Sequence, residues 1–465
     1  MWHYNLSARH LDKLCERVDT FSVSGDGERL VVRHRDDTIV VPSSHKVDDD
    51  DPAYIRVDLT RLRRTVNPRA EWRQMFDENG RLMASHYWRE DMNGVDWDSV
   101  LNRYRPLVDL CHVVDDLHDI LWETVAELNT SHSYVSASGA AGDSDMRAGL
   151  LGADVSSGND GAKVVRVIPG ESSDPRAWSP LRAAGVAVTE GDVIVAVDGR
   201  KVGADGNLGE LLEGSAGRVV ELTVRRGENE RQVAVVPMAD EAPLRYHDWV
   251  ASRRRYVEEH SGGRLGYLHV PDMVSDGWAE LHRQIGEATR HEGVIADVRF
   301  NHGGHTSQLV VERLARRVVG WDYSRWYATA DTYPQNAVRG PIVMVTNQWA
   351  GSDGDIVAAA TQAMGYAKVI GERSWGGVVG IDGRFDLVDG TSVTQPRYAG
   401  WYGSYGWGVE NHGVDPDIVV TVSPEDWEAD CDVQLDAAIA ECLRQLDDKP
   451  AATAPELPGP AFDRC

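Results

Sequence analysis

The sequence predicts a multidomain protein of mixed class, α+β and α/β. We expect a short N-terminal β segment, a small helical domain, a β domain, and an α/β domain made of a sheet and helices. The 465 residues are enough for about three domains. A helical pattern at 60–135 gives way to strand-like runs after a stretch rich in Gly, Ser and Asp at 143–160. From 241 to 448 apolar strands and helices alternate, which is typical of a sheet covered by helices.

The β segment, residues 1–45, contains two short strands at 25–33 and 36–41 that are joined by polar turns. A lone hairpin cannot bury its own faces. We therefore expect this segment to be one edge of a repeat structure whose other blades are absent, and the chain to be the C-terminal part of a longer protein. The acidic run 48–51 before Pro52 predicts a linker.

The helical domain is expected at residues 46–142. One helix is predicted from residue 67, and a second begins at Asp115 and ends near Asn129. The apolar residues on one face of the first helix are Trp72, Met75, Phe76, Leu82, Met83 and Tyr87. Spacings of three and four residues indicate an amphipathic helix in both places.

The β domain is expected at 143–240 and the α/β domain at 241–448. The predicted strands of the β domain are 163–168, 191–199 and 219–227, with a helical piece at 208–213. The predicted strands of the α/β domain are 265–270, 293–299 and 342–345, and its helices are 278–289, 306–319 and 356–364. The Pro- and Ala-rich stretch 449–465 predicts a disordered tail.

Composition argues against several classes of function. The chain has 48 Lys and Arg against 74 Asp and Glu, a net charge of −26, which disfavours nucleic acid and anionic membranes as partners. The five cysteines are scattered without a CxxC pair, so neither a disulfide framework nor a zinc pattern is present. No apolar run approaches the length of a transmembrane helix, and the first residues do not resemble a signal peptide. We expect a cytoplasmic protein with no cofactor and no metal.

The stretch Ala350-Gly351-Ser352-Asp353-Gly354-Asp355 lies between a predicted strand and a predicted helix. A serine on such a turn is held exposed, next to the free N–H groups of the helix N-terminus. Serine nucleophiles of hydrolases favour this geometry. A Ser or Asp that caps the helix, with glycines that serve the turn, explains the same residues. The local sequence leaves both interpretations open.

A nucleophilic Ser352 needs a base. Lys368, the nearest downstream lysine, does not stand four or five positions away, so we expect a histidine. His132 lies in a polar turn directly after the second predicted helix, where it can point into a cleft. Its neighbours Ser131 and Ser133 can orient the imidazole or a water. The alternative is a histidine that only complements the charge at the helix C-terminus.

The loop after the predicted strand 293–299 offers backbone donors. Gly303 and Gly304 are adjacent glycines at a strand end, which allow an N–H group to face an oxyanion. A plain strand-to-helix turn is the alternative. His302 and His305 form an HxxH pair without an evident third ligand, so no zinc site is predicted.

A further polar loop, residues 406–417, contains Glu410. Its carboxylate can orient a serine or a histidine. The alternative is an ordinary solvated loop acid.

Two motifs indicate the type of the β domain. Gly149-Leu150-Leu151-Gly152 resembles the carboxylate-binding loop of PDZ domains, in which backbone N–H groups hold a peptide C-terminus. The run GDVIVAVDG at 191–199 resembles the PDZ motif GDxIxxVDG. An unrelated β-hairpin is the alternative. We therefore expect 143–240 to be a PDZ-like domain.

A helical domain, a PDZ-like domain and an α/β domain in this order resemble the C-terminal half of tricorn-type proteases, which are relatives of the C-terminal processing peptidases. The matching pieces are 96–106, 127–132, the PDZ motif, 299–304, 350–355 and 408–411. They span most of residues 55–445, and their number and order make the resemblance specific.

The resemblance implies a Ser-His-Ser-Glu tetrad. Ser352 would be the nucleophile and His132 its general base, while Ser131 and Glu410 would be the supporting polar residues. This agrees with the residues chosen above from local chemistry.

The resemblance also implies an oxyanion hole, formed by the N–H of Asp353 and that of Gly304 or Gly303. Asp322 would favour basic side chains of a peptide bound to a neighbouring copy. Family members are hexamers and have two β-propellers, of which residues 1–45 would be a remnant.

We therefore predict a serine endopeptidase or oligopeptidase that cleaves short peptides, such as proteasome products, through an acyl-enzyme. Two alternatives remain. One is a C-terminal processing protease that uses a Ser–Lys pair, and the other is a non-catalytic peptide-binding scaffold built around the PDZ-like domain.

Overall fold

The structure is a computed structural model that describes residues 1–35, 37–63, 65–138, 146–203, 206–327 and 329–457. The chain divides into two compact units, residues 1–71 and 72–465. The predicted multidomain fold of mixed class is confirmed, because small antiparallel sheets, a helical part and a parallel sheet with helices follow one another along the chain.

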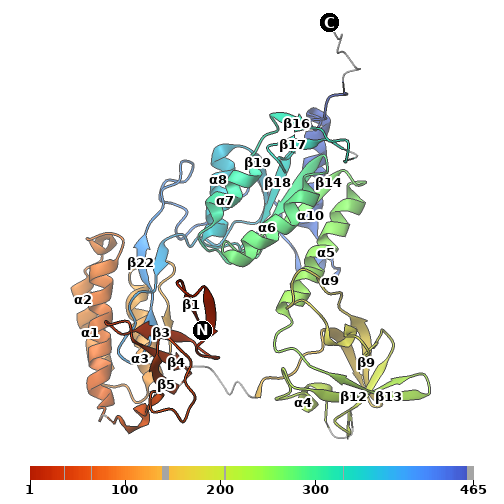
Figure 1. Cartoon of the computed structure of the whole chain (residues 1–465). Coiled ribbons are helices and arrows are strands. Elements are labelled where there is room, and N and C mark those ends of the chain that lie inside the picture. The colour runs from red at the N-terminus through yellow and green to blue at the C-terminus, as the bar shows by residue number, and fades with distance from the viewer. Residues whose placement is uncertain (36, 64, 139–145, 204–205, 328, 458–465) are drawn as a thin grey trace. The chain divides into compact units, whose positions relative to one another are not determined.

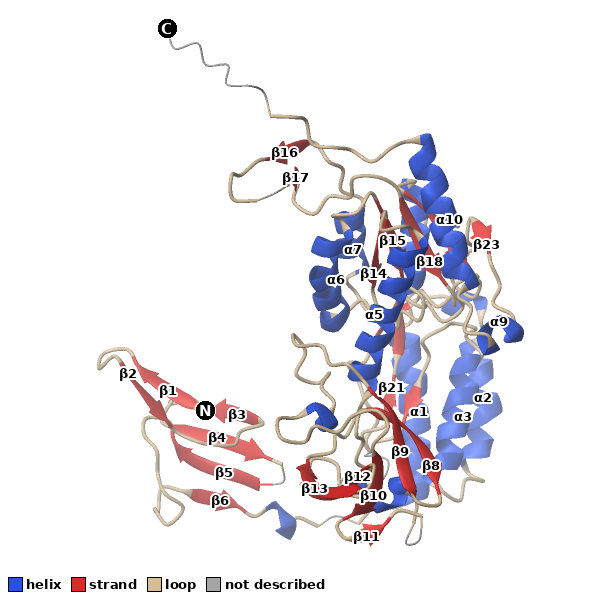
Figure 2. Cartoon of the chain, turned by 90° about the vertical axis from the view of Figure 1, so that its right-hand side faces the viewer, coloured by secondary structure: helices blue, strands red, loops and turns tan. Residues whose placement is uncertain are grey.

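The first unit is built from short antiparallel strands (Figure 2). One pair is β1–β2, and the other strands form a sheet of order β3-β4-β5-β6. Their bounds are β1 Trp2–Asn5, β2 His10–Lys13, β3 Thr20–Val23, β4 Arg29–His34, β5 Asp37–Pro42 and β6 Ile55–Val57. The two predicted strands are present as β4 and β5. The acidic run 48–51, expected to be a linker, lies instead in the loop between β5 and β6, so the sheet continues beyond residue 45.

The helical part contains α1 Pro68–His86, α2 Trp97–Val108 and α3 Val114–Ala126. The two predicted helices correspond to α1 and α3. The helix α2 was not predicted from the sequence. It begins after the N-cap Asp96 and buries Trp97 and Val100 against its neighbours.

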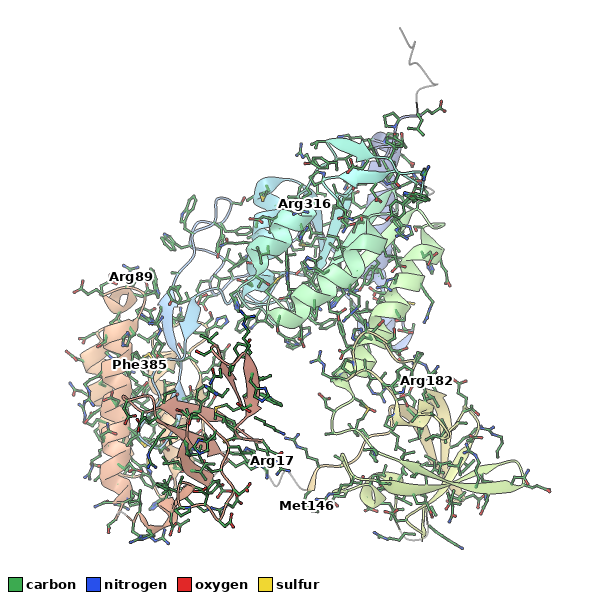
Figure 3. The ribbon with its side chains drawn as sticks, in the orientation of Figure 1. Arg17, Arg89, Met146, Arg182, Arg316 and Phe385 are labelled. Carbon is green, nitrogen blue, oxygen red and sulfur yellow. The ribbon has the colours of Figure 1, made fainter. Side chains whose placement is uncertain are left out.

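A segment from much later in the chain completes the helical core. Leu387 and Val393 pack among the apolar side chains of α1, α2 and α3. The strand β21 Ser392–Val393 pairs with β7 Val135–Ser136, just after α3. The neighbouring strands β20 Gly380–Asp382 and β22 Gln395–Tyr398 pair with each other, and β22 lies beside the helices in Figure 1. Phe385, labelled in Figure 3, stacks on His86 of α1 with ring centroids 4.8 Å apart.

The β domain is an antiparallel sheet of order β13-β12-β10-β9-β8, with β11 paired to β10. Its elements are β8 Ala153–Gly158, β9 Gly161–Val167, β10 Val193–Val197, β11 Arg200–Lys201, α4 Leu208–Leu211, β12 Val220–Arg226 and β13 Asn229–Val235. Alternate residues of β9, β10 and β12, such as Val164, Ile194 and Leu222, are fully buried in one core. The three predicted strands are therefore present.

The α/β domain has a parallel sheet of order β14-β15-β18-β19-β23. Its strands are β14 Leu265–His269, β15 Gly293–Asp297, β18 Ile342–Thr346, β19 Ala367–Gly371 and β23 Ile418–Val419. Its helices are α5 Ala242–His260, α6 Ser275–Ala288, α7 Ser307–Leu314, α8 Asp353–Met364, α9 Pro424–Glu428 and α10 Val433–Asp448. Every residue of β14, β15 and β18 is buried, as expected of parallel strands covered on both faces.

Helices cover the two faces of this sheet in separate layers (Figure 1). Side chains of α6, α7 and α8 share one core with the sheet, and those of α5 and α10 share another. A small hairpin, β16 Gly320–Asp322 and β17 Asp331–Tyr333, follows α7. Of the tail predicted to be disordered, residues 458–465 lie outside the described residues, and the Ala452 N–H donates to the Arg339 carbonyl at 2.8 Å.

None of the helices in the described parts of the chain is both long enough and apolar enough to cross a membrane. Cys15, Cys111, Cys431 and Cys442 are free thiols.

We predict that Val393→Ala lowers the free energy of unfolding by about 1–3 kcal/mol, because it leaves a cavity in a fully buried position of the helical core. Urea denaturation measures this change. The matched control is Val388→Ala in the same segment, where the side chain is 51% exposed and the expected change is below about 0.5 kcal/mol. Equal effects of the two substitutions would contradict the packing described here.

Candidate active site

Ser352 stands at the N-cap position of α8, a few residues after the carboxyl end of β18. Its backbone has φ 59° and ψ −120°, a sparsely populated conformation for a residue with a side chain. Its side chain makes no capping hydrogen bond to the helix. The interpretation of Ser352 as a helix cap therefore does not account for its hydroxyl, which stays available on a strained turn.

His132 lies in the turn after α3 and is half-buried. Its backbone carbonyl accepts the Thr394 hydroxyl at 2.5 Å, and the Tyr134 N–H donates to the same Thr394 oxygen at 2.7 Å. Burial lowers the pKa of His132 below its ordinary value of 6.5, and the charge of Glu410 acts in the opposite direction. A neutral imidazole suits a general base and does not complement a helix C-terminus.

The Glu410 carboxylate is held by four donors. Its Oε1 accepts the Ser131 N–H at 2.7 Å, and its Oε2 accepts the Ser131 hydroxyl at 3.0 Å. The N–H groups of Val378 and Val379 also donate to Oε2, at 2.8 and 3.0 Å. Glu410 is therefore not a freely solvated loop acid.

Ser131 joins this carboxylate to the imidazole. Its Oγ lies 3.0 Å from Nδ1 of His132. Because the Ser131 hydroxyl donates its proton to Glu410, its oxygen can only accept from the ring, which makes Nδ1 the protonated nitrogen. Nε2 of His132 then keeps a free lone pair.

Trp375 contacts both halves of the site. Its ring lies edge-on to the His132 ring, with centroids 5.3 Å apart. A Cβ added to Gly351 would lie 2.7 Å from Cε3 of the same indole, and the backbone N–H of Trp375 donates to the Ala350 carbonyl at 3.0 Å. The hydrogen bonds among the described residues do not include one between Ser352 and His132. Trp375 thus contacts the His132 ring on one side and the turn that carries Ser352 on the other.

The glycine loop lies against the serine turn. A Cβ on Gly303 would lie 2.5 Å from Cβ of Ser352, and the Gly303 N–H donates to Oδ1 of Asn301 at 2.9 Å. Gly304 is exposed and has φ 147°. Within the described part of the chain, the N–H groups of Gly304 and Asp353 have no acceptor. Of these two unpaired backbone donors, one belongs to the residue after Ser352 and the other to the glycine loop that lies against the serine turn.

The remaining predicted residues lie outside this cluster. His302 and His305 are exposed, and the described residues contain no group of three or more potential metal ligands. Asp322 is exposed on β16, opposite Asp331 of β17, without a described contact to Ser352 or His132. Lys368 is exposed on β19, where its Nζ lies 3.8 Å from Asp417.

The loop that resembles a PDZ carboxylate site is largely used by the chain itself. The Gly149 N–H donates to the Leu212 carbonyl, and the Leu150 N–H donates to the Met238 carbonyl, both at 2.8 Å. The Gly152 N–H donates to the Glu241 carboxylate at 3.2 Å. Only part of this loop is therefore free to hold a peptide C-terminus.

Sequence reasoning missed two residues that the structure brings to the site. Trp375 had no recognisable signal, because an exposed tryptophan beside two glycines is typical of many loops. Asp355 did have a recognisable sequence signal, because a Ser followed three residues later by an acid at a helix start indicates a capping box. Asp355 is fully buried next to the Ser352 turn.

Three family models match the chain. They are the tricorn protease C1 domain at 68–126, the tricorn protease PDZ domain at 149–240 and peptidase family S41 at 264–420. Tricorn protease homolog 1 of Streptomyces coelicolor is 56% identical over 460 residues, which cover 98% of this chain and 43% of that protein. The chain belongs to the tricorn protease family. The predicted resemblance, including the PDZ domain, is confirmed.

Other tricorn proteins match over the same length. The tricorn protease of Thermoplasma acidophilum is 35% identical over 444 residues, which cover 95% of this chain and 41% of that protein. The crystal structure of the tricorn protease superposes with a TM-score of 0.85 at 33% identity, over 96% of this chain and 43% of that one. The chain thus spans less than half the length of these tricorn relatives.

The conformation of Ser352 has a measurable consequence. We predict that Ser352→Gly is more stable than Ser352→Ala by about 1 kcal/mol, because glycine adopts a positive φ without a steric cost whereas alanine keeps the strain. Chemical denaturation of the two variants, which both lack the hydroxyl, measures the difference. A Ser352→Ala protein as stable as the glycine variant would contradict the strained turn.

Proposed function

We propose that this chain is the catalytic part of a serine peptidase, which hydrolyses short peptides through an acyl-enzyme. The observation that supports this most directly is the hydrogen-bonded series Glu410–Ser131–His132. Its imidazole contacts Trp375, which also contacts the turn of a serine whose hydroxyl caps nothing. A serine hydroxyl is a weak nucleophile unless a base removes its proton. An imidazole held at Nδ1 presents Nε2 for this task.

In this proposal Ser352 Oγ attacks the carbonyl carbon of the peptide bond while His132 Nε2 takes the hydroxyl proton. His132 then gives this proton to the leaving amine, and the C–N bond breaks. A water molecule then attacks the resulting ester while the same imidazole takes its proton. The ester C–O bond breaks, the acid product leaves, and the imidazole returns the proton to Ser352 Oγ. Ser131 and Glu410 keep the ring in the required tautomer and stabilise its positive charge.

The oxyanion of the tetrahedral intermediate would accept hydrogen bonds from the N–H groups of Asp353 and Gly304. These donors have no acceptor among the described residues, and such preorganised donors stabilise developing negative charge. Gly303, the other glycine that the sequence suggests, suits the role less, because its N–H already donates to Asn301. The absence of a side chain on Gly303 leaves room for Ser352.

The remaining parts of the proposal rest on family membership and composition. They are a homo-oligomeric, hexameric assembly, a cytoplasmic location, and Asp322 as the acid that favours basic substrate side chains. The Ser–Lys alternative has little support from Lys368, which is exposed and lies beside Asp417.

We predict that Ser352→Ala and His132→Ala each lower peptide hydrolysis by about 10⁴-fold or more, since a nucleophile and its base act as one unit. Fluorogenic peptide turnover and labelling by a fluorophosphonate probe measure the loss, and circular dichroism checks the fold. A wild-type chain that is neither labelled nor active would indicate a peptide-binding scaffold. A His132→Ala variant labelled at the wild-type rate would indicate a different base, as in a Ser–Lys enzyme.

The rate of labelling should fall as the pH drops through the pKa of His132, which lies below 6.5, because only the neutral ring is a base. Glu410→Gln removes a charge that raises this pKa, so the midpoint should move to lower pH. Trp375→Ala exposes the ring to water and relieves its desolvation, so the midpoint should move to higher pH. Labelling rates across pH measure both shifts. Shifts in the same direction would contradict these electrostatic assignments.

A further inference from the structure

Asp355 is a fully buried carboxylate in the first turn of α8. Its Oδ1 accepts the Ser374 hydroxyl and, at 2.8 Å, the Gly376 N–H. Its Oδ2 accepts the Gly377 N–H at 3.2 Å. All three donors belong to the segment after β19, about twenty residues further along the chain. The Ser352 backbone N–H also donates to Asp355, as in a helix cap. A carboxylate that served only as a cap would not accept three further donors from another segment.

We propose that Asp355 is a positioning residue that ties the turn bearing Ser352 to the segment 374–379. This inference rests on the serine peptidase proposed above and adds to it a group that does not touch the substrate. It explains how the nucleophile and the base, which come from separate parts of the chain, keep a fixed mutual placement.

The segment 374–379 contacts the histidine, the glutamate and the serine turn of the site. It contains Trp375, whose indole lies against His132. Its last two N–H groups, from Val378 and Val379, donate to the Glu410 carboxylate. A shift of this segment would therefore move the tryptophan and the carboxylate together.

The same segment is fastened to the loop that follows Glu410. The Ser374 hydroxyl oxygen accepts the Val414 N–H at 2.8 Å, and the Asn411 N–H donates to the Gly376 carbonyl at 2.7 Å. A Cβ on Gly376 would lie 2.5 Å from the Gly413 nitrogen, so the two loops are in direct backbone contact. Asp355 is the charged group at the centre of this packing.

Burial raises the pKa of the Asp355 carboxyl to about 6, while the donors from Ser374, Gly376, Gly377 and the Ser352 backbone lower it. A buried carboxyl is costly unless its hydrogen bonds are complete. The number of donors aimed at Asp355 indicates that the surrounding loops are arranged around this group.

The test compares Asp355→Asn with wild type in the full chain. We expect the rate constant of fluorophosphonate labelling per folded molecule to fall about 10–100-fold, the effect of a small misplacement of reacting groups. The dissociation constant of a peptide, measured by calorimetry in a Ser352→Ala background, should change less than about threefold. Loss of rate without loss of binding separates positioning from a general weakening of the fold.

Asp192→Asn is the matched control. Asp192 is also a buried aspartate with a backbone N–H donor, Thr189, but it pairs with Arg226 in the PDZ domain. This variant should lose thermal stability and keep the wild-type labelling rate. If Asp355→Asn behaves in the same way, its role is structural only and the proposal is overturned.

Ser374→Ala and Ser374→Thr keep the proposal testable if Asp355→Asn does not fold. Ser374→Ala removes one donor and should lower the labelling rate, whereas Ser374→Thr retains a hydroxyl and should restore most of it. Wild-type labelling in Ser374→Ala would overturn the role of Asp355. Failure of the peptidase proposal is seen separately, because the wild-type chain itself would then remain unlabelled.

Discussion

The hydrogen bonds between Glu410 and Ser131 are the interaction on which the site depends. They join residues 279 positions apart and hold the turn with His132 against the α/β domain. These bonds are possible because the segment 380–398 enters the core of the helical part, where Val393 is fully buried and β21 pairs with β7. Apolar packing therefore places two loops next to each other, and a carboxylate with four donors determines their final geometry.

A second constraint comes from the parallel sheet. The loop with Gly303 and Gly304 follows β15, the turn with Ser352 follows β18, and the segment with Trp375 follows β19. These strands are neighbours and run in the same direction, so the loops after them meet at one edge of the sheet. Sites of open α/β sheets form at this edge. The strain at Ser352 and the buried charge of Asp355 are both tolerated here, because the packed strands and helices beneath hold the loops in place.

Much of the fold follows from local patterns. Apolar runs predicted β14, β15 and β18, since strands buried on both faces have no polar side. Spacings of three and four residues predicted α1 and α3. The strands β1, β2 and β3 were missed because they are only four residues long and mostly exposed, with little alternation to detect. The packing of residues 380–398 against the helices was also not predictable, because no local pattern indicates which distant core a strand will join.

The sequence by itself determined which chemical groups are present and where they stand on their elements. Ser352 lies at a helix start, Gly303 and Gly304 follow a strand, and the order of motifs indicates the family. Only the tertiary structure decided how these groups are paired. It placed Ser131 between Glu410 and His132, used the Gly303 N–H within its own loop, and brought Asp355 and Trp375 into the site. Hydrogen bonds between distant loops depend on packing that local sequence does not encode.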